Sequence, residues 1–225
     1  FPKDKYLKIF LYIDMSAETT NVRKAPLRIS EISALFDLQY PGVIADKLFE
    51  GIINEANGLF FHPPGPIRIT AIPVLQPEDI RRRISENIVN IASLDQNDRE
   101  RYQLAARWFR KGFETLNPVD KLIAWWTVLE IYPAVGSSDI PKFVCDLLVE
   151  RVYPKLSSSE LKIKLKIGLI CGIRSKIIHD GKAYVGDSET DTFSDYTDRL
   201  HAIATVCLRL LIGLEPGNEL DKYVT

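Results

Sequence analysis

Apolar residues recur at the three- and four-residue spacing of an α-helix along most of this 225-residue chain. The clearest example is the segment 78–94, where Ile80, Ile84, Ile88 and Ile91 would share one helix face. Four further helices are predicted at residues 98–115, 118–130, 141–152 and 192–214. The pattern therefore predicts a mainly α-helical protein.

The segment 161–167 fits two interpretations. Leucine or isoleucine alternates with lysine at a period of two, which is typical of a strand. The apolar positions continue through Ile170 and Ile173, however, and this continuation favours a helix. We predict a helix here.

Residues 1–76 have a different pattern. Three helical segments are followed by a strand, a proline-stiffened loop and a returning strand, at residues 5–15, 31–38, 43–56, 59–61, 62–66 and 67–70. This order resembles a winged helix-turn-helix domain, which implies a small α+β domain at 1–76, a connecting helix within 77–97 and a helical unit at 98–225. A winged helix commonly reads DNA with its third helix, but that helix carries three carboxylates against Lys47 alone. We therefore expect a protein contact or a dimerising role more than DNA binding.

Composition places the chain among ordinary globular proteins, with 46% hydrophobic residues, 26% charged residues and a net charge of −1. Its three cysteines are widely spaced in apolar segments, so we expect neither a disulfide framework nor a metal site, and a reducing cytoplasm fits best. No apolar run reaches the ~18 residues of a membrane span, so no membrane contact is expected. Because the chain begins with Phe1, we expect a trimmed or processed chain, or a piece of a longer one.

Although the net charge of the whole chain is close to zero, one segment of it is basic. Residues 155–182 hold seven basic residues and two acidic ones, a local balance of +5, whereas residues 187–198 hold five acidic residues and no basic one. A local basic surface of this kind is what RNA binding requires. We expect Lys166, Ser175, Lys176 and Lys182 to contact such a substrate.

Arg174 and His179 lie within this basic segment, with four residues between them. Histidine titrates near neutral pH and arginine presents a planar, permanently charged fork that fits phosphate oxygens, so the pair can cleave a phosphodiester without a metal or cofactor. Asp180-Gly181 predicts that the helix ends there, because glycine suits a left-handed C-terminal cap.

A helical unit with Glu130 on an early helix and Arg-x4-His on a late one resembles the HEPN superfamily, in particular its Apea-like branch. The resemblance covers residues 98–215 and implies a HEPN-like helical bundle, often a metal-independent ribonuclease whose active site forms between two copies. It further implies that Arg174 and His179 are the motif residues, that Glu130 is the accompanying acid, and that microbial defence or a toxin-like role is the context. The residue after the arginine is often asparagine in that family, and here it is Ser175.

Other interpretations remain open for several residues. Arginine and histidine near a helix C-terminus also occur for structural reasons, because cations stabilise the exposed carbonyls. Trp125 and Trp126 are adjacent, so we expect at most one of them to face the core. Residues 81–83, three arginines, are expected to form a solvated face, and His201 is expected to be an ordinary residue of the last helix.

Two other functions compete with the ribonuclease hypothesis. One is a catalytically silent bundle that dimerises or binds nucleotides, and the other is a transcription regulator acting through residues 1–76. RNA, a second copy of the chain and a regulatory protein are the partners that we expect.

Overall fold

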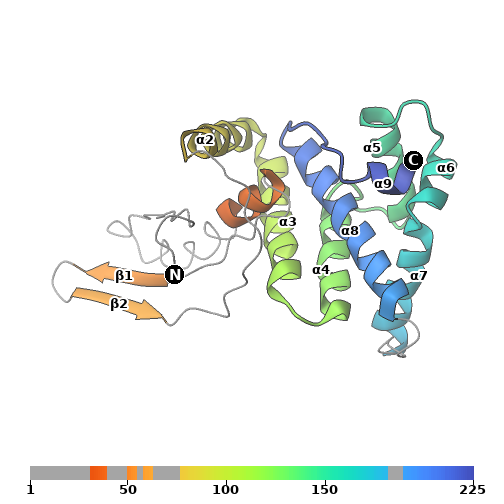
Figure 1. The fold of residues 1–225 in the computed structure, drawn as a ribbon, viewed down its shortest axis with the longest axis horizontal. Coiled ribbons are helices and arrows are strands. Elements are labelled where there is room, and N and C mark those ends of the chain that lie inside the picture. Colours follow the sequence, from red (N-terminus) through yellow and green to blue (C-terminus); the bar gives the residue numbers. More distant parts are fainter. Residues whose placement is uncertain (1–30, 40–49, 55–57, 63–76, 182–189) are drawn as a thin grey trace.

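The computed structural model describes residues 31–39, 50–54, 58–62, 77–181 and 190–225. Within these ranges the chain is mainly helical and has one two-stranded hairpin (Figure 1). The predicted mainly α fold is therefore confirmed. A helix at residues 31–39 precedes α2 (Pro77–Ser93), α3 (Gln96–Glu114), α4 (Pro118–Ile131), α5 (Ile140–Arg151), α6 (Ser158–Lys164), α7 (Ile167–Asp180), α8 (Thr190–Leu211) and α9 (Asp221–Val224).

Side-chain caps explain why several of these helices begin where they do. The Asp95 carboxylate accepts a hydrogen bond from the first turn of α3, and the Asn117 side chain does the same for α4, where Pro118 occupies the first turn. Ser157 and Glu160 form a reciprocal capping box at the start of α6. These local signals made the start of α4 readable from the sequence.

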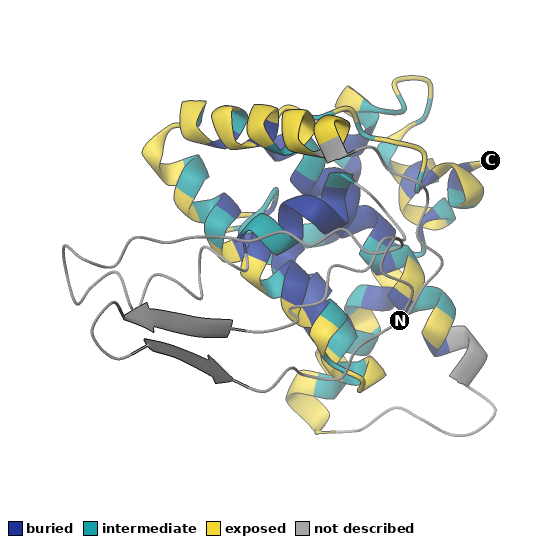
Figure 2. Cartoon of the chain, turned by 60° about the vertical axis from the view of Figure 1, so that its left-hand side comes forward, coloured by how far each residue is buried: buried dark blue, intermediate teal, exposed yellow. Residues whose placement is uncertain are grey.

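The core lies where α3, α4 and α8 pack together, and buried residues concentrate in the interior of this bundle (Figure 2). The expectation that only one of the adjacent tryptophans faces the core is wrong, because Trp125 is 5% and Trp126 is 1% exposed. The reason is that α4 is enclosed by α3, α5, α7 and α8, so opposite sides of the helix both meet protein. The indole N–H of each tryptophan donates a hydrogen bond, to the Phe109 carbonyl at 3.1 Å and to the Glu130 carboxylate at 2.9 Å respectively.

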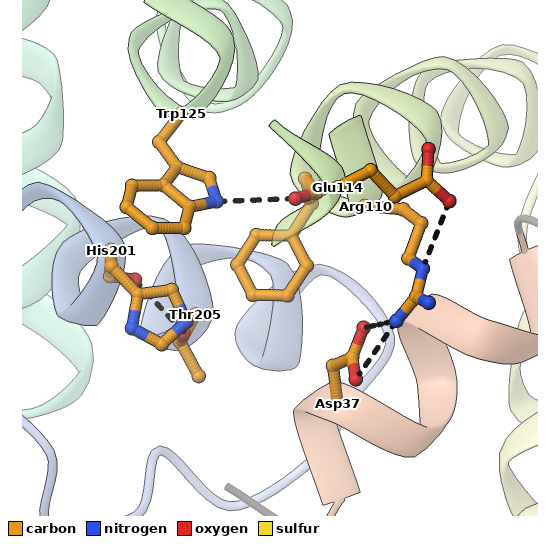
Figure 3. Close-up of polar contacts among 7 residues, drawn as sticks. Asp37, Arg110, Glu114, Trp125, His201 and Thr205 are labelled. Carbon is orange, nitrogen blue, oxygen red and sulfur yellow. Dashed lines mark hydrogen bonds and ion pairs between the residues drawn. The ribbon is translucent and has the colours of Figure 1, made fainter. Parts of the chain in front are cut away.

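The helix at residues 31–39 shares this core. Leu35 and Leu38 are at most 1% exposed and belong to the same apolar cluster as the bundle residues. The Asp37 carboxylate pairs with the Arg110 guanidinium at 3.1 Å, and the two side chains are only 2% and 6% exposed (Figure 3). Residues 31–39, which we assigned to the first domain from the sequence, are therefore packed as part of the helical unit.

The hairpin corrects one prediction for residues 1–76. β1 (Glu50–Asn54) pairs with β2 (Gly58–His62) in antiparallel register, with Ile52 opposite Phe60. The helix predicted at 43–56 is therefore wrong in its last part, where consecutive β-branched isoleucines favour a strand. The strand predicted at 59–61 is confirmed within β2, whereas the predicted helix at 5–15 and strand at 67–70 lie outside the described residues.

The ambiguous segment at 161–167 is helical, as predicted, but it is divided between α6 and α7. Lys166 forms the joint with a left-handed backbone (φ 55°). Leu165 and Ile167, on either side of the joint, are fully buried, whereas Ile163 is 76% exposed. The period-two pattern thus comes from a helix break and does not mark one face of a strand.

None of the helices in the described ranges combines the length and the apolar character that crossing a membrane would require.

Candidate active site

Arg174 and His179 both lie in the second half of α7, which packs against α4, α5, α6 and α8. The helix ends at Asp180, and Gly181 follows with the left-handed values φ 62° and ψ 18°. The predicted glycine cap is therefore confirmed. The last carbonyls of α7, which have no partner within the helix, lie beside His179.

Arg174 is held by Glu130. Its Nη2 atom lies 2.7 Å from Oε1 of the carboxylate, and the two side chains are 27% and 31% exposed. The same Oε1 atom accepts the hydrogen bond of the Trp126 indole N–H at 2.9 Å. Glu130 thus connects α4 to α7, the helix that carries the motif. It is the acidic residue that the family resemblance implied.

His179 is exposed in the last turn of α7. Five residues along an ideal helix correspond to a rotation of about 140° and a rise of about 7.5 Å, so His179 and Arg174 point to different sides of α7. No side-chain hydrogen bond or ion pair links the His179 imidazole to the described part of the chain. Within one chain, the imidazole is therefore available to a partner or ligand, but the helix does not aim it at the Arg174–Glu130 pair.

The structure places some of the residues predicted to contact the substrate beside the motif and others away from it. Ser175 and Lys176 are exposed on α7 beside the motif. Lys166 lies at the opposite end of α7, about 20 Å along the helix from His179, and its ammonium pairs with Asp195 at 3.1 Å. The structure therefore does not bring Lys166 to Arg174 and His179. Lys182 lies outside the described residues.

Burial disfavours the thiolate form of all three cysteines. Cys145 and Cys207 are buried and Cys171 is half-buried, and all three are free. Burial raises the pKa of the Cys145 thiol to about 11, which disfavours the thiolate that nucleophilic attack and metal binding need. In the ranges that the structure describes, no cluster of histidine, cysteine or carboxylate side chains could hold a metal ion.

His201 is more distinctive than its sequence context indicated. Its ring stacks on Phe109 at a centroid distance of 5.5 Å and contacts Phe113 at 5.0 Å. It also contacts Trp125 at 4.8 Å (Figure 3). Burial lowers its pKa from 6.5 to about 4, and the positive charge of Lys222 acts in the same direction. His201 is therefore neutral near pH 7, and its half-buried ring packs against these aromatic side chains.

Two hollows in the surface lie apart from the motif. One of about 310 Å³ separates α2 from the end of α8, and Arg82, Arg83 and Arg209 are among its lining residues. The other, of about 440 Å³, lies beside His201. Neither is lined by Arg174 or His179. Residues 81–83 are exposed, as predicted, and Arg82 pairs with carboxylates of its own helix.

Sequence reasoning missed Trp126 as part of this site. The signal was present, because Trp126 and Glu130 are four residues apart on one helix, a spacing that places two side chains next to each other. We considered the two adjacent tryptophans only as candidates for the core.

No protein-family model matches this chain, and neither the curated proteins nor the solved structures gave a match.

Proposed function

We propose that two copies of this chain form a metal-independent endoribonuclease. In each active site Arg174 binds the scissile phosphate, His179 transfers a proton, and Glu130 orients Arg174. The observation that carries the proposal is the 2.7 Å ion pair that connects Arg174 on α7 with Glu130 on α4. The pair is partly exposed, so a phosphate can approach the guanidinium while the carboxylate holds it in place.

The chemistry needs only groups that these residues supply. The 2′-hydroxyl of RNA loses its proton and its oxygen attacks the adjoining phosphorus, while the bond to the 5′-oxygen breaks and that oxygen gains a proton. Arg174 stabilises the negative charge on the phosphate oxygens in the transition state. His179 acts as the acid or the base. The products are a 2′,3′-cyclic phosphate and a 5′-hydroxyl, and DNA resists cleavage because it lacks the attacking group.

A second copy supplies what one chain does not. Each chain offers one motif histidine, and it lies on a different side of α7 from Arg174. The histidine of a second copy can meet the Arg174 that the histidine of its own chain does not face. The surface of α7 is suited to close approach, because Gly168 and Gly172 are exposed on it one turn apart. A Cβ atom at Gly172 would meet nothing within 4 Å, so packing within the chain gives no reason for glycine there. Leu169 and Ile178, which are 59% and 49% exposed, add apolar surface on the same helix.

Other parts of the chain have supporting roles in this proposal. Ser175 and Lys176 contact the RNA beside the motif, and the β1–β2 hairpin belongs to a winged-helix-like module that binds a regulatory protein. DNA is the less favoured ligand of that module. The enzyme works in the cytoplasm, in microbial antiviral defence or as a toxin.

The decisive experiment is RNA cleavage in excess EDTA by the wild type, His179→Ala and Arg174→Ala. We expect the wild type to release a 2′,3′-cyclic phosphate, and His179→Ala to lose a factor of about 10²–10⁴ in rate with an unchanged circular dichroism spectrum. An RNA with a single 2′-deoxy substitution at the cut site serves as the substrate control and should stay intact. Unchanged cleavage by His179→Ala would remove that residue from the mechanism.

Mixing the two inactive variants tests whether the site is shared between chains. If Arg174 of one copy and His179 of the other act on the same phosphate, a mixed dimer retains one intact pair and regains part of the activity. A mixture that stays inactive after subunit exchange would contradict the composite site. Dimers of the wild type that cut no RNA would instead support the catalytically silent bundle.

A further inference from the structure

Trp126 reaches the proposed site from inside the protein. Its side chain is 1% exposed on α4, and its indole N–H donates to Oε1 of Glu130 at 2.9 Å. Nη2 of Arg174 lies 2.7 Å from the same oxygen atom. A buried core residue, a half-buried carboxylate and a half-buried guanidinium are therefore joined at one acceptor atom.

The hydrogen bond restricts a side chain that would otherwise move. The terminal torsion of a glutamate is broad, and an ion pair that is about 30% exposed holds its partners weakly. A tryptophan packed in the core has one N–H in a fixed direction, so it selects one position of the carboxylate. A guanidinium that binds this carboxylate through Nη2 presents further donors on Nε and Nη1, which can face a phosphate.

We infer that Trp126 is a positioning residue for Arg174 and that it acts through Glu130. This inference rests on the proposed function of the Arg174 site. The orientation of the phosphate-binding arginine on α7 is set by α4, through two contacts on one oxygen atom.

The chain contains a matched control on the same helix. Trp125 is also buried, at 5% exposure, and its indole N–H donates to the carbonyl of Phe109 at 3.1 Å. Trp125→Phe and Trp126→Phe remove the same chemical group from adjacent residues of one helix. Only the second change removes a donor from Glu130, so a purely structural effect should appear in both variants.

The experiment compares both variants in the wild-type and in the Glu130→Ala background. We expect Trp126→Phe to lower kcat/KM about tenfold, the effect of losing one hydrogen bond to a charged group, and Trp125→Phe to leave it within about twofold. Without the Glu130 carboxylate, Trp126→Phe should have no further effect. Equal losses in both tryptophan variants, or an undiminished loss in the Glu130→Ala background, would overturn the inference.

A second measurement does not depend on turnover. The side-chain N–H signals of Arg174 in ¹⁵N NMR spectra, assigned with Arg174→Lys, should exchange faster with water in Trp126→Phe and remain unchanged in Trp125→Phe. If the wild type cuts no RNA, the proposed function fails while this comparison still decides the inference, and identical exchange in both variants would refute it. If Trp126→Phe does not fold, Arg174→Lys is compared with the wild type instead. This change should shift the indole N–H signal of Trp126 but not that of Trp125. An unshifted Trp126 signal would refute the inference that Trp126 acts on Arg174 through Glu130.

Discussion

Mild acid should destabilise this protein because of His201. The imidazole is packed among the rings of Phe109, Phe113 and Trp125, and burial lowers its pKa from 6.5 to about 4. In the unfolded chain the same group binds a proton near its ordinary pKa of about 6.5. Between these two values the unfolded state binds more protons than the folded state, so stability is complete above pH 6.5 and is lost as the pH falls toward 4.

The size of the effect follows from the two pKa values. Lowering the pH from about 7 to about 5 should cost roughly 2 kcal/mol of unfolding free energy, and a further step to pH 4 should bring the loss to roughly 3 kcal/mol. Model carboxylates titrate near pH 4, so the comparison is cleanest above about pH 4.5. The positive charges of Lys222 and Lys121 also lower the pKa of His201.

Urea unfolding at about pH 7 and pH 5, followed by circular dichroism, measures this loss. In His201→Phe, which keeps an aromatic ring at this position and removes the titration, the two unfolding free energies should differ by less than about 0.5 kcal/mol. His179→Ala is the matched control, because the exposed His179 has no such packing, and it should keep the full acid sensitivity of the wild type. An equal loss in His201→Phe and the wild type would refute the reasoning.

Three further substitutions test the packing. Arg110→Met removes the guanidinium that pairs with the buried Asp37, so we expect the free energy of unfolding in chemical denaturation to fall by about 3–5 kcal/mol. A fall of less than about 1 kcal/mol would show that helix 31–39 is not anchored there. Gly112→Ala places a methyl group against the indole ring of Trp125 on α4 and should destabilise the fold by about 1–3 kcal/mol. Gly172→Ala meets no neighbouring atom and should stabilise the isolated chain by about 0.5–1 kcal/mol in thermal unfolding at low protein concentration, and a loss there would contradict an open α7 surface.

Local signals in the sequence were sufficient for most of the helical bundle. The apolar periodicity of α2 and the Asn117-Pro118 start of α4 are properties of neighbouring residues, and the structure has both helices where they were predicted. The left-handed Gly181 cap was predictable for the same reason, since few residues other than glycine adopt that backbone conformation. Each of these features depends on contacts within one or two turns.

Contacts between distant parts of the chain were harder to predict. The burial of both Trp125 and Trp126 depends on helices that cover α4 from several sides, and no pattern within α4 shows which neighbours it will have. Lys166 belongs to a basic segment in the sequence, but Asp195 on α8 binds its ammonium. The pairing of Glu130 with Arg174 was expected only through the family resemblance, because neither helix alone indicates that the two side chains meet.

The positions of the tryptophans make them intrinsic fluorescence probes of one part of the protein. All three tryptophans of the sequence are on α3 and α4: Trp108 is half-buried on α3, and Trp125 and Trp126 are shielded from water on α4. Intrinsic fluorescence of the intact chain therefore reports on this helix pair. When α3 and α4 separate, the emission should move to longer wavelength, whereas a rearrangement confined to the hairpin should leave the spectrum unchanged.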